Sequence, residues 1–371
     1  MTSLEQVPPE EASQIENIIK LTRQQMEKNY PPGRAALRAQ HAKSHATVTG
    51  TLRVRDDLPE SRRRGIFATL GHEYQAWIRY SNAAAIAGAD SMVKDGAFVA
   101  HASRGMALKI LGVPGDPLLP TGSVEQDFLM VNHPVFPFAN VADYEAVSEV
   151  IAASPDGKPD AFFAKRIRAL SDGSPDLTDP VTSRALRTLG IVKRIQSLST
   201  SGNPKAFQGP PACPTDNQYF AGAPFMFGAD QVMRVRVVPI SPAGDTAPDP
   251  ADPDYLRTTL AARLKAPGAA EPRFEFQAQV RDALSLTIDT DIEDASRDWN
   301  ETVTPFETLA VVTISPQDCD TADRKAFGET LTFSPWHGII AHRPLGGINR
   351  LRRAVYDASA AYRRGSHAAH P

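Results

Sequence analysis

Apolar residues recur at two different periods along this chain, and the period separates the expected helices from the expected strands. Helical spacing covers residues 9–30, 141–170 with a turn near Pro155, 180–199 and 254–265. Alternating or β-rich segments predict strands in the second half of 38–54 and at 77–82, 103–111, 126–136, 232–238, 274–280 and 306–314. Long antiparallel strands with helices inserted between them indicate an α+β single domain built around a β-barrel.

A further helix is expected at residues 345–364, after a turn marked by Pro344 and two adjacent glycines. At ~100° per residue, Arg352, Tyr356, Ser359 and Arg363 fall on one narrow stripe of this helix. Two arginines and a tyrosine are unusual on the inner face of a helix. The alternative is a surface helix whose arginines are solvated and whose tyrosine packs by its ring.

This stripe has the chemistry of a metal-binding phenolate. An arginine one turn before a tyrosine can hydrogen-bond the phenol oxygen and stabilise its charged form. Free tyrosine has a pKa of ~10, so a phenolate needs such help or a metal. Tyrosine phenolate is one known axial ligand of haem iron. In that case Arg352 would support Tyr356, and Arg363 would suit a haem propionate.

Composition and charge are ordinary and exclude several partners. The 371 residues are 42% hydrophobic and 22% charged, with a net charge of −3, so no polyanion or nucleic-acid partner is expected. The short basic clusters at 62–64 and 350–353 are expected to be solvated or paired with carboxylates. Two cysteines, Cys213 and Cys319, cannot form a disulfide scaffold, which favours a reducing compartment. Without a signal peptide or a membrane-length apolar run, we expect a cytoplasmic protein.

Five segments occur in an order that resembles the haem catalase superfamily, and more closely its small catalase-related branch of minicatalases and catalase-like peroxidases. The segments are Arg38-Ala-Gln-His-Ala-Lys43, Arg79-Tyr-Ser81, Arg104-Gly-Met-Ala-Leu-Lys109, Val131-Asn-His-Pro-Val-Phe136 and Arg352 to Tyr356. The resemblance implies a catalase-like antiparallel β-barrel haem domain with inserted and flanking helices at residues 36–364. An N-terminal helical arm (1–35) would precede this domain, and a disordered tail (365–371) would follow it.

The resemblance also implies a role for each matching residue. Tyr356 would be the ligand of the iron in haem b, with Arg352 keeping it ionised. His41 would move the proton of a bound peroxide, Ser81 would fix the tautomer of His41, and Asn132 would orient the peroxide. The remaining matches are the expected propionate partners Arg38, Arg79 and Arg363, and Phe136, which would pack near the haem plane or simply in the core.

Some features depart from the pattern or leave a choice open. His45 competes with His41 for the distal role, but only His41 has the arginine three residues before it and Lys43 two after it. The other histidine of the pair is expected to be an ordinary surface residue. Gln40 stands where ordinary catalases carry an apolar residue, and Tyr80 replaces a phenylalanine. Because little chain follows Arg363, we expect no NADPH, and a homodimer or monomer.

The expected activity is a haem peroxidase with weak catalase activity. It would reduce hydrogen peroxide or an organic hydroperoxide through a ferryl intermediate and use a small phenolic reductant. Three alternatives remain open: a fatty-acid hydroperoxide dehydratase or lyase like allene oxide synthase, a non-catalytic haem carrier or sensor, and an efficient catalase. Product analysis with and without an electron donor separates the peroxidase from the dehydratase or lyase.

Overall fold

The computed structural model describes residues 4–31, 33–84, 87–94, 97–101, 103–120, 124–154, 159–197, 213–240, 242, 249, 251–266, 268 and 270–368. Within these ranges, none of the helices combines the length and the apolar character that crossing a membrane requires. Cys213 and Cys319 are both buried and free, in keeping with the expected absence of a disulfide framework.

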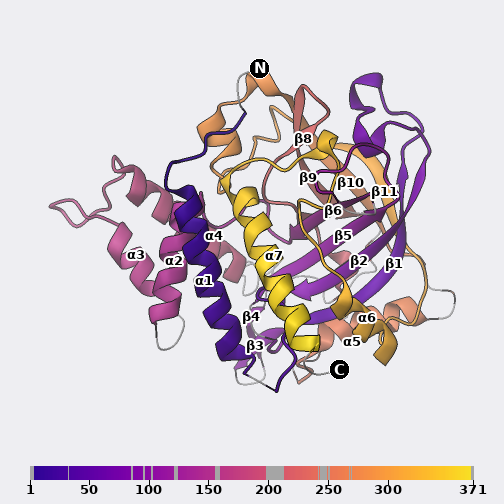
Figure 1. The fold of residues 1–371 in the computed structure, drawn as a ribbon, viewed down its shortest axis with the longest axis horizontal. Coiled ribbons are helices and arrows are strands. Elements are labelled where there is room, and N and C mark those ends of the chain that lie inside the picture. Colours follow the sequence, from indigo (N-terminus) through magenta and orange to yellow (C-terminus); the bar gives the residue numbers. More distant parts are fainter. Residues whose placement is uncertain are drawn as a thin grey trace.

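Eight antiparallel strands close into a barrel, which confirms the predicted fold class (Figure 1). Around the barrel they are β10 (Arg273–Asp282), β11 (Glu307–Ile314), β1 (Ser44–Val54), β2 (Glu73–Asn82), β5 (Arg104–Leu111), β6 (Glu125–Val131), β7 (Tyr219–Phe220) and β9 (Gln231–Pro239). Pairing of β9 with β10 completes the ring. A short strand, β8 (Phe225–Phe227), extends β9, and β3 (Ser91–Lys94) pairs with β4 (Ala97–His101) in a separate sheet.

Alternation along each strand divides its side chains between the barrel core and the outer face. On β2, Ile78 and Tyr80 are fully buried in the main hydrophobic core, whereas Arg79 and Ser81 project to the other face. The core is rich in phenylalanine, and the ring of Phe128 lies 5.0 Å from that of Phe276. The outer face of β2, β5 and β6 is therefore free to carry polar groups.

Seven helices are described, and they lie outside the barrel (Figure 1). Their bounds are α1 Glu11–Asn29, α2 Val141–Ala153, α3 Asp160–Arg166, α4 Pro180–Ser197, α5 Tyr255–Lys265, α6 Ala322–Thr330 and α7 Gly347–Ala368. Helix α7 crosses the outer face of the barrel with α1 packed beside it, and α5 and α6 pack on β1. The break between α2 and α3 agrees with the expected turn, although residues 155–158 lie outside the described ranges.

Helix α7 follows the predicted glycine turn but ends later than expected. Gly346 has a φ of 85°, and a Cβ there would lie 2.4 Å from the carbonyl oxygen of Ile292, so this turn requires glycine. At the other end, helical structure continues through Gly365 to Ala368, into the segment expected to be a tail. Residues 369–371 lie outside the described ranges.

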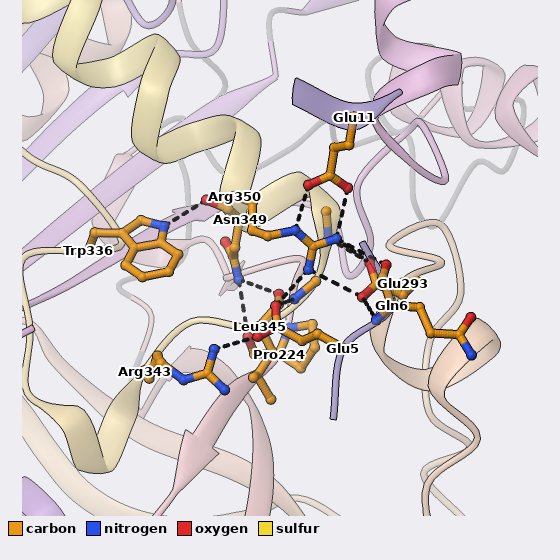
Figure 2. Close-up of polar contacts among 12 residues, drawn as sticks. Glu5, Gln6, Glu11, Pro224, Glu293, Trp336, Arg343, Leu345, Asn349 and Arg350 are labelled. Carbon is orange, nitrogen blue, oxygen red and sulfur yellow. Dashed lines mark hydrogen bonds and ion pairs between the residues drawn. The ribbon is translucent and has the colours of Figure 1, made fainter. Parts of the chain in front are cut away.

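Arg350, in the first turn of α7, joins that helix to the N-terminal arm (Figure 2). It makes two hydrogen bonds to Glu11 of α1, at 2.6 and 2.8 Å, and further bonds to Glu5 at 2.7 Å and Glu293 at 3.0 Å. The expected pairing of this basic cluster with carboxylates is therefore confirmed at Arg350, and also at Arg62, which binds Glu307.

The same carboxylates satisfy the free N–H groups at the start of α7. Glu5 accepts from the backbone N–H of Gly346 at 2.9 Å, and Glu293 accepts from that of Gly347 at 2.8 Å. Free N–H groups and the positive end of the helix dipole both favour negative charge here. Glu5 in the N-terminal arm and Glu293 in the segment before β11 therefore fix the start of α7.

We expect Glu11→Ala to lower the free energy of unfolding by about 1–3 kcal/mol, because it removes two charge-assisted bonds from a carboxylate that is only 4% exposed. Denaturant unfolding measures this change. Glu16→Ala, at an exposed position of the same helix, is the matched control and should change little. Equal effects of the two substitutions would show that the Glu11 ion pair contributes nothing.

Candidate functional site

Two rows of outward-facing residues on β2, β5 and β6 form the floor of a pocket. The strand register places them side by side as Ser81, Gly105 and Val131 in one row and Arg79, Ala107 and Leu129 in the next. The middle strand contributes only glycine and alanine to these rows. The small side chain of Ala107 leaves space above the sheet for a ligand, and Gly105 leaves space for the ring of His41.

Helix α7 supplies the opposite wall. Arg352, Val355, Tyr356, Ser359 and Arg363 all line the pocket, so the stripe predicted from the helical period faces the barrel. The pocket holds about 780 Å³ of space, part of it open to solvent.

His41 lies at the barrel side of the pocket, just before β1. Its Nδ1 is 2.9 Å from the hydroxyl oxygen of Ser81, and its carbonyl oxygen accepts a hydrogen bond from Arg79 at 3.1 Å. With a φ of 57°, it is the one non-glycine residue with positive φ in the part of the chain that the structure describes. Such strained backbone persists where the surroundings hold it, often at functional sites.

The imidazole of His41 is neutral at ordinary pH. Burial lowers its pKa to about 3, and the guanidinium groups of Arg79, Arg352 and Arg38 add to the shift by repelling a second positive charge. A neutral imidazole inside a pocket can accept a proton from a bound ligand.

The ring of His41 packs against the backbone of Gly105. A Cβ added at residue 105 would lie 2.4 Å from Nδ1 and 2.5 Å from Cε1 of His41, and 3.0 Å from the Ser81 hydroxyl oxygen. These distances are too short for any real contact, so the ring packs directly against the glycine backbone. Position 105 therefore has to lack a side chain if the His41–Ser81 pair is to keep this geometry.

If the protein binds haem and reacts with peroxide, as the resemblance implies, Gly105→Ala should displace the His41 ring and lower the rate of that reaction by at least tenfold, since small misplacements of a reacting group are costly. Stopped-flow spectroscopy of the haem-loaded protein measures that rate. Ala107→Gly, at the next outward position of the same strand, is the control and should leave the rate within a few-fold. A Gly105→Ala protein that reacts at the normal rate would contradict this role for the glycine.

His45 occupies a different environment from His41. It does not line the pocket but is 3% exposed, with Nε2 2.9 Å from the side-chain oxygen of Asn82. Asn82 in turn donates to Asp90, which pairs with Lys43 at 2.7 Å. The expectation that one histidine of the pair is a surface residue is wrong, because the start of β1 folds into this buried polar network.

Three arginines converge at one end of the pocket. Arg38, Arg79 and Arg363 come from the segment before β1, from β2 and from α7, and all three line the pocket. One carboxylate, that of Glu329 in α6, faces them at 2.7 Å from Arg38, 3.6 Å from Arg79 and 3.8 Å from Arg363. Nε of Arg79 and Nη1 of Arg363 are buried and make no hydrogen bond to the described residues.

These arginines carry more positive charge than Glu329 can neutralise. Burial, together with repulsion from neighbouring arginines, lowers the pKa of Arg38 to about 9 and the pKa values of Arg79 and Arg363 to about 10. They nevertheless remain cationic at neutral pH. Buried cations with unused donors beside a large pocket fit a ligand that carries carboxylates, as the propionates of haem do.

Arg352 contacts the ring of Tyr356, whereas a hydrogen bond to its phenol oxygen was expected. Its guanidinium lies 5.5 Å from the centre of the Tyr356 ring, and its N–H groups go to the carbonyl oxygen of Leu129 at 3.2 Å and to Asn349 at 3.3 Å. The arginine therefore lies over the ring instead of bonding the phenol oxygen, because Leu129 and Asn349 hold it. The contact is a cation–π interaction.

Comparison with solved structures places this architecture among known folds. A fungal catalase superposes with a TM-score of 0.60 at 16% identity, covering 90% of this chain and 60% of that one. Catalase A from Saccharomyces cerevisiae superposes with a TM-score of 0.62 at 17% identity, covering 97% and 65%. The fold is catalase-like. The chain spans less than two thirds of the length of these catalases, and neither a family model nor a curated protein matches its sequence.

Two predicted site residues do not line the pocket. The side-chain oxygen of Asn132 accepts from the hydroxyl of Ser103 at 3.0 Å and from the N–H of Arg104 at 2.9 Å. Phe136 packs against Tyr144 and the hydrophobic cluster beneath α7, with its ring centre 5.8 Å from that of Tyr144. Their proposed roles stay predictions.

Three residues to which the sequence assigned no firm role contribute to the pocket or to the residues that line it. Gly105 stood within a recognised segment but carried no role, although its place between larger strand residues was a signal. Gln40 does line the pocket, which the sequence left open. Glu329 belongs to a nine-residue helix that was not predicted, and no motif pointed to it.

A second group of potential ligands, among the described residues outside the pocket, is paired with a lysine. Glu125, Asp127 and His337 lie close enough together to hold a metal ion. The ammonium group of Lys109, however, binds Glu125 and lies 2.9 Å from Asp127. This buried lysine already pairs with both carboxylates, so we interpret the cluster as structural.

Proposed function

We propose that this protein is a haem-dependent peroxidase of the small catalase-related branch, with weak catalase activity. One observation carries the proposal: a pocket lies between the barrel face that bears His41 and the helix that bears Tyr356, and three arginines, two of them buried, converge at one end. Haem b has the two carboxylates that these arginines suit. The substrate would be hydrogen peroxide or an organic hydroperoxide.

The chemistry of the residues that line the pocket fits haem. Tyr356 would be the iron ligand, and Arg38, Arg79 and Arg363 would bind the propionates. When bound, haem b would supply the iron chemistry that cleaves a peroxide O–O bond. Ala107 contributes only a methyl group to the floor of the pocket.

The protein would supply the proton transfers. With Nδ1–H donating to Ser81, the lone pair of Nε2 in His41 is available to accept the proton of a hydroperoxide. The imidazolium then returns that proton to the departing oxygen, which leaves as water or an alcohol. The strongly lowered pKa of His41 favours this return, because an acid with a low pKa gives up its proton readily.

The deciding experiment is an absorption spectrum of the purified protein, followed by assays with and without a phenolic donor. Peroxidase activity predicts a high-spin ferric phenolate spectrum and donor-dependent reduction of the hydroperoxide to an alcohol. Conversion of a fatty-acid hydroperoxide without a donor would identify a dehydratase or lyase. Haem binding without turnover would identify a carrier or sensor, and absence of haem binding would overturn the proposal.

We expect Gln40→Val to raise the ratio of oxygen-evolving catalase activity to phenol-oxidising peroxidase activity. The Gln40 amide can both donate and accept, so it can hold the His41 imidazole or a water in one arrangement. An apolar residue removes this restraint without touching haem ligation. Oxygen evolution and phenol oxidation, measured side by side on both proteins, check the ratio. An unchanged or lower ratio would rule out this role for Gln40.

A further inference from the structure

Glu329 is the one charged residue of the arginine cluster that does not line the pocket. It sits near the end of α6, with its side chain 21% exposed, and it is not among the residues that line the ligand volume, whereas Arg38, Arg79 and Arg363 are. A carboxylate that enters the pocket would therefore share these arginines with Glu329.

The arginine cluster carries an excess of positive charge. Three guanidinium groups, from Arg38, Arg79 and Arg363, face one carboxylate, so two positive charges remain without a partner in the cluster. A ligand with two carboxylates would neutralise that excess. The cluster matches a dianion, and it would carry one further uncompensated charge without Glu329.

Backbone carbonyl groups hold the arginines independently of Glu329. Arg38 donates to the carbonyl oxygens of Gly328 at 2.9 Å and Leu331 at 2.8 Å. Arg363 also donates to Leu331, at 3.0 Å, and Arg79 donates to His41, at 3.1 Å. Replacing Glu329 by glutamine keeps an oxygen for Arg38, so the substitution changes the charge and leaves these anchors intact.

We propose that Glu329 is a positioning residue that sets the net charge of the arginine cluster. It neutralises one arginine when the pocket is empty, and it limits how strongly the pocket holds a dicarboxylate tetrapyrrole. This inference rests on the proposed haem function. Glu329 would stabilise the empty site and weaken the binding of the dicarboxylate ligand.

Glu329→Gln should change the stability of the empty protein and its affinity for a dianion in opposite directions. The empty protein should be less stable, because three buried guanidinium groups lose their one carboxylate partner. Binding of a dianion should be tighter, because the attraction between the cluster and the ligand carboxylates is no longer opposed by a nearby negative charge. A residue with a purely structural role would weaken both.

The experiment uses metal-free protoporphyrin IX and its dimethyl ester, so that ligation by Tyr356 plays no part. Fluorescence titration gives the affinity of each porphyrin for the full-length protein. The variants are Glu329→Gln, Glu329→Asp, which keeps the charge, and Asp323→Asn, at an exposed position of the same helix. We expect the preference for the diacid over the ester to rise roughly tenfold in Glu329→Gln alone.

Thermal unfolding with and without the diacid provides the second measurement. The empty Glu329→Gln protein should melt at a lower temperature than the wild type and should gain more from the diacid. If this variant folds only with the diacid present, that result supports the inference too, and Glu329→Asp should then behave as the wild type.

An unchanged or reduced preference for the diacid in Glu329→Gln would overturn the inference. If the wild type meanwhile binds haem with a phenolate spectrum, the proposed function stands without it. A wild-type protein that binds neither porphyrin nor haem would overturn both.

Discussion

Replacing Tyr356 by phenylalanine is expected to abolish the ferric phenolate spectrum or most of the bound haem. Tyr356 lies on the pocket-facing stripe of α7, one turn after Arg352, and no other tyrosine lines the pocket among the described residues. Phenylalanine keeps the ring beneath the Arg352 guanidinium but removes the only oxygen that this side chain offers to iron. Absorption spectra and haem content of the purified variant measure the loss.

The matched control for this substitution is Tyr362→Phe. Tyr362 belongs to the same helix but packs with Met26 and Tyr30 of the arm, outside the pocket. Haem content and spectrum should remain normal in this protein. An unchanged spectrum in Tyr356→Phe, or equal losses in both variants, would show that the iron ligand is elsewhere.

Replacing His41 by alanine is expected to leave haem binding intact and to slow the reaction with peroxide. General acid–base catalysis typically contributes ~10²–10⁴-fold, which sets the size of the loss. The side chain contacts Ser81 and lines the pocket from the barrel side, whereas Tyr356 belongs to α7. Rapid mixing of the haem-loaded protein with peroxide gives the rate.

His45→Ala is the comparison that tests the choice between the two histidines. His45 lies in the buried network with Asn82 and Asp90, so its removal should lower stability but cost far less in peroxide reactivity. Unfolding experiments on both variants separate the two effects. A larger loss of reactivity at His45 than at His41, or equal losses, would reverse the assignment.

The barrel could be predicted from the sequence because seven of its eight strands have seven or more residues. The strands that were missed are β7 in the barrel and β3, β4 and β8 outside it, and each has only two to five residues, which is too short for a clear periodic signal. Helix α6 was missed for a similar reason, since nine residues with few apolar positions give a weak helical pattern. The structure therefore adds local elements to a barrel that periodicity already indicated.

For the site, local motifs predicted which residues meet but not how they contact one another. The stripe on α7 and the segment before β1 bring Tyr356 and His41 into one pocket, as the resemblance implied. Contacts set by distant strands could not be predicted: the carbonyl oxygen of Leu129 draws Arg352 over the Tyr356 ring. Glu329 likewise gains its role only when α6 packs against β1, and no local pattern encodes that.

The salt bridges of Arg350 also affect when the site can be completed. Glu5 and Arg350 are separated by 345 positions, and the barrel lies between them in the sequence. During synthesis from the N-terminus, α1 and the barrel strands exist before α7 emerges. The arm can therefore form its salt bridges to Arg350 only after α7 has been made. Contacts between such remote segments form late because closing long loops is entropically costly. We therefore expect the pocket to be completed only after α7 has emerged and docked.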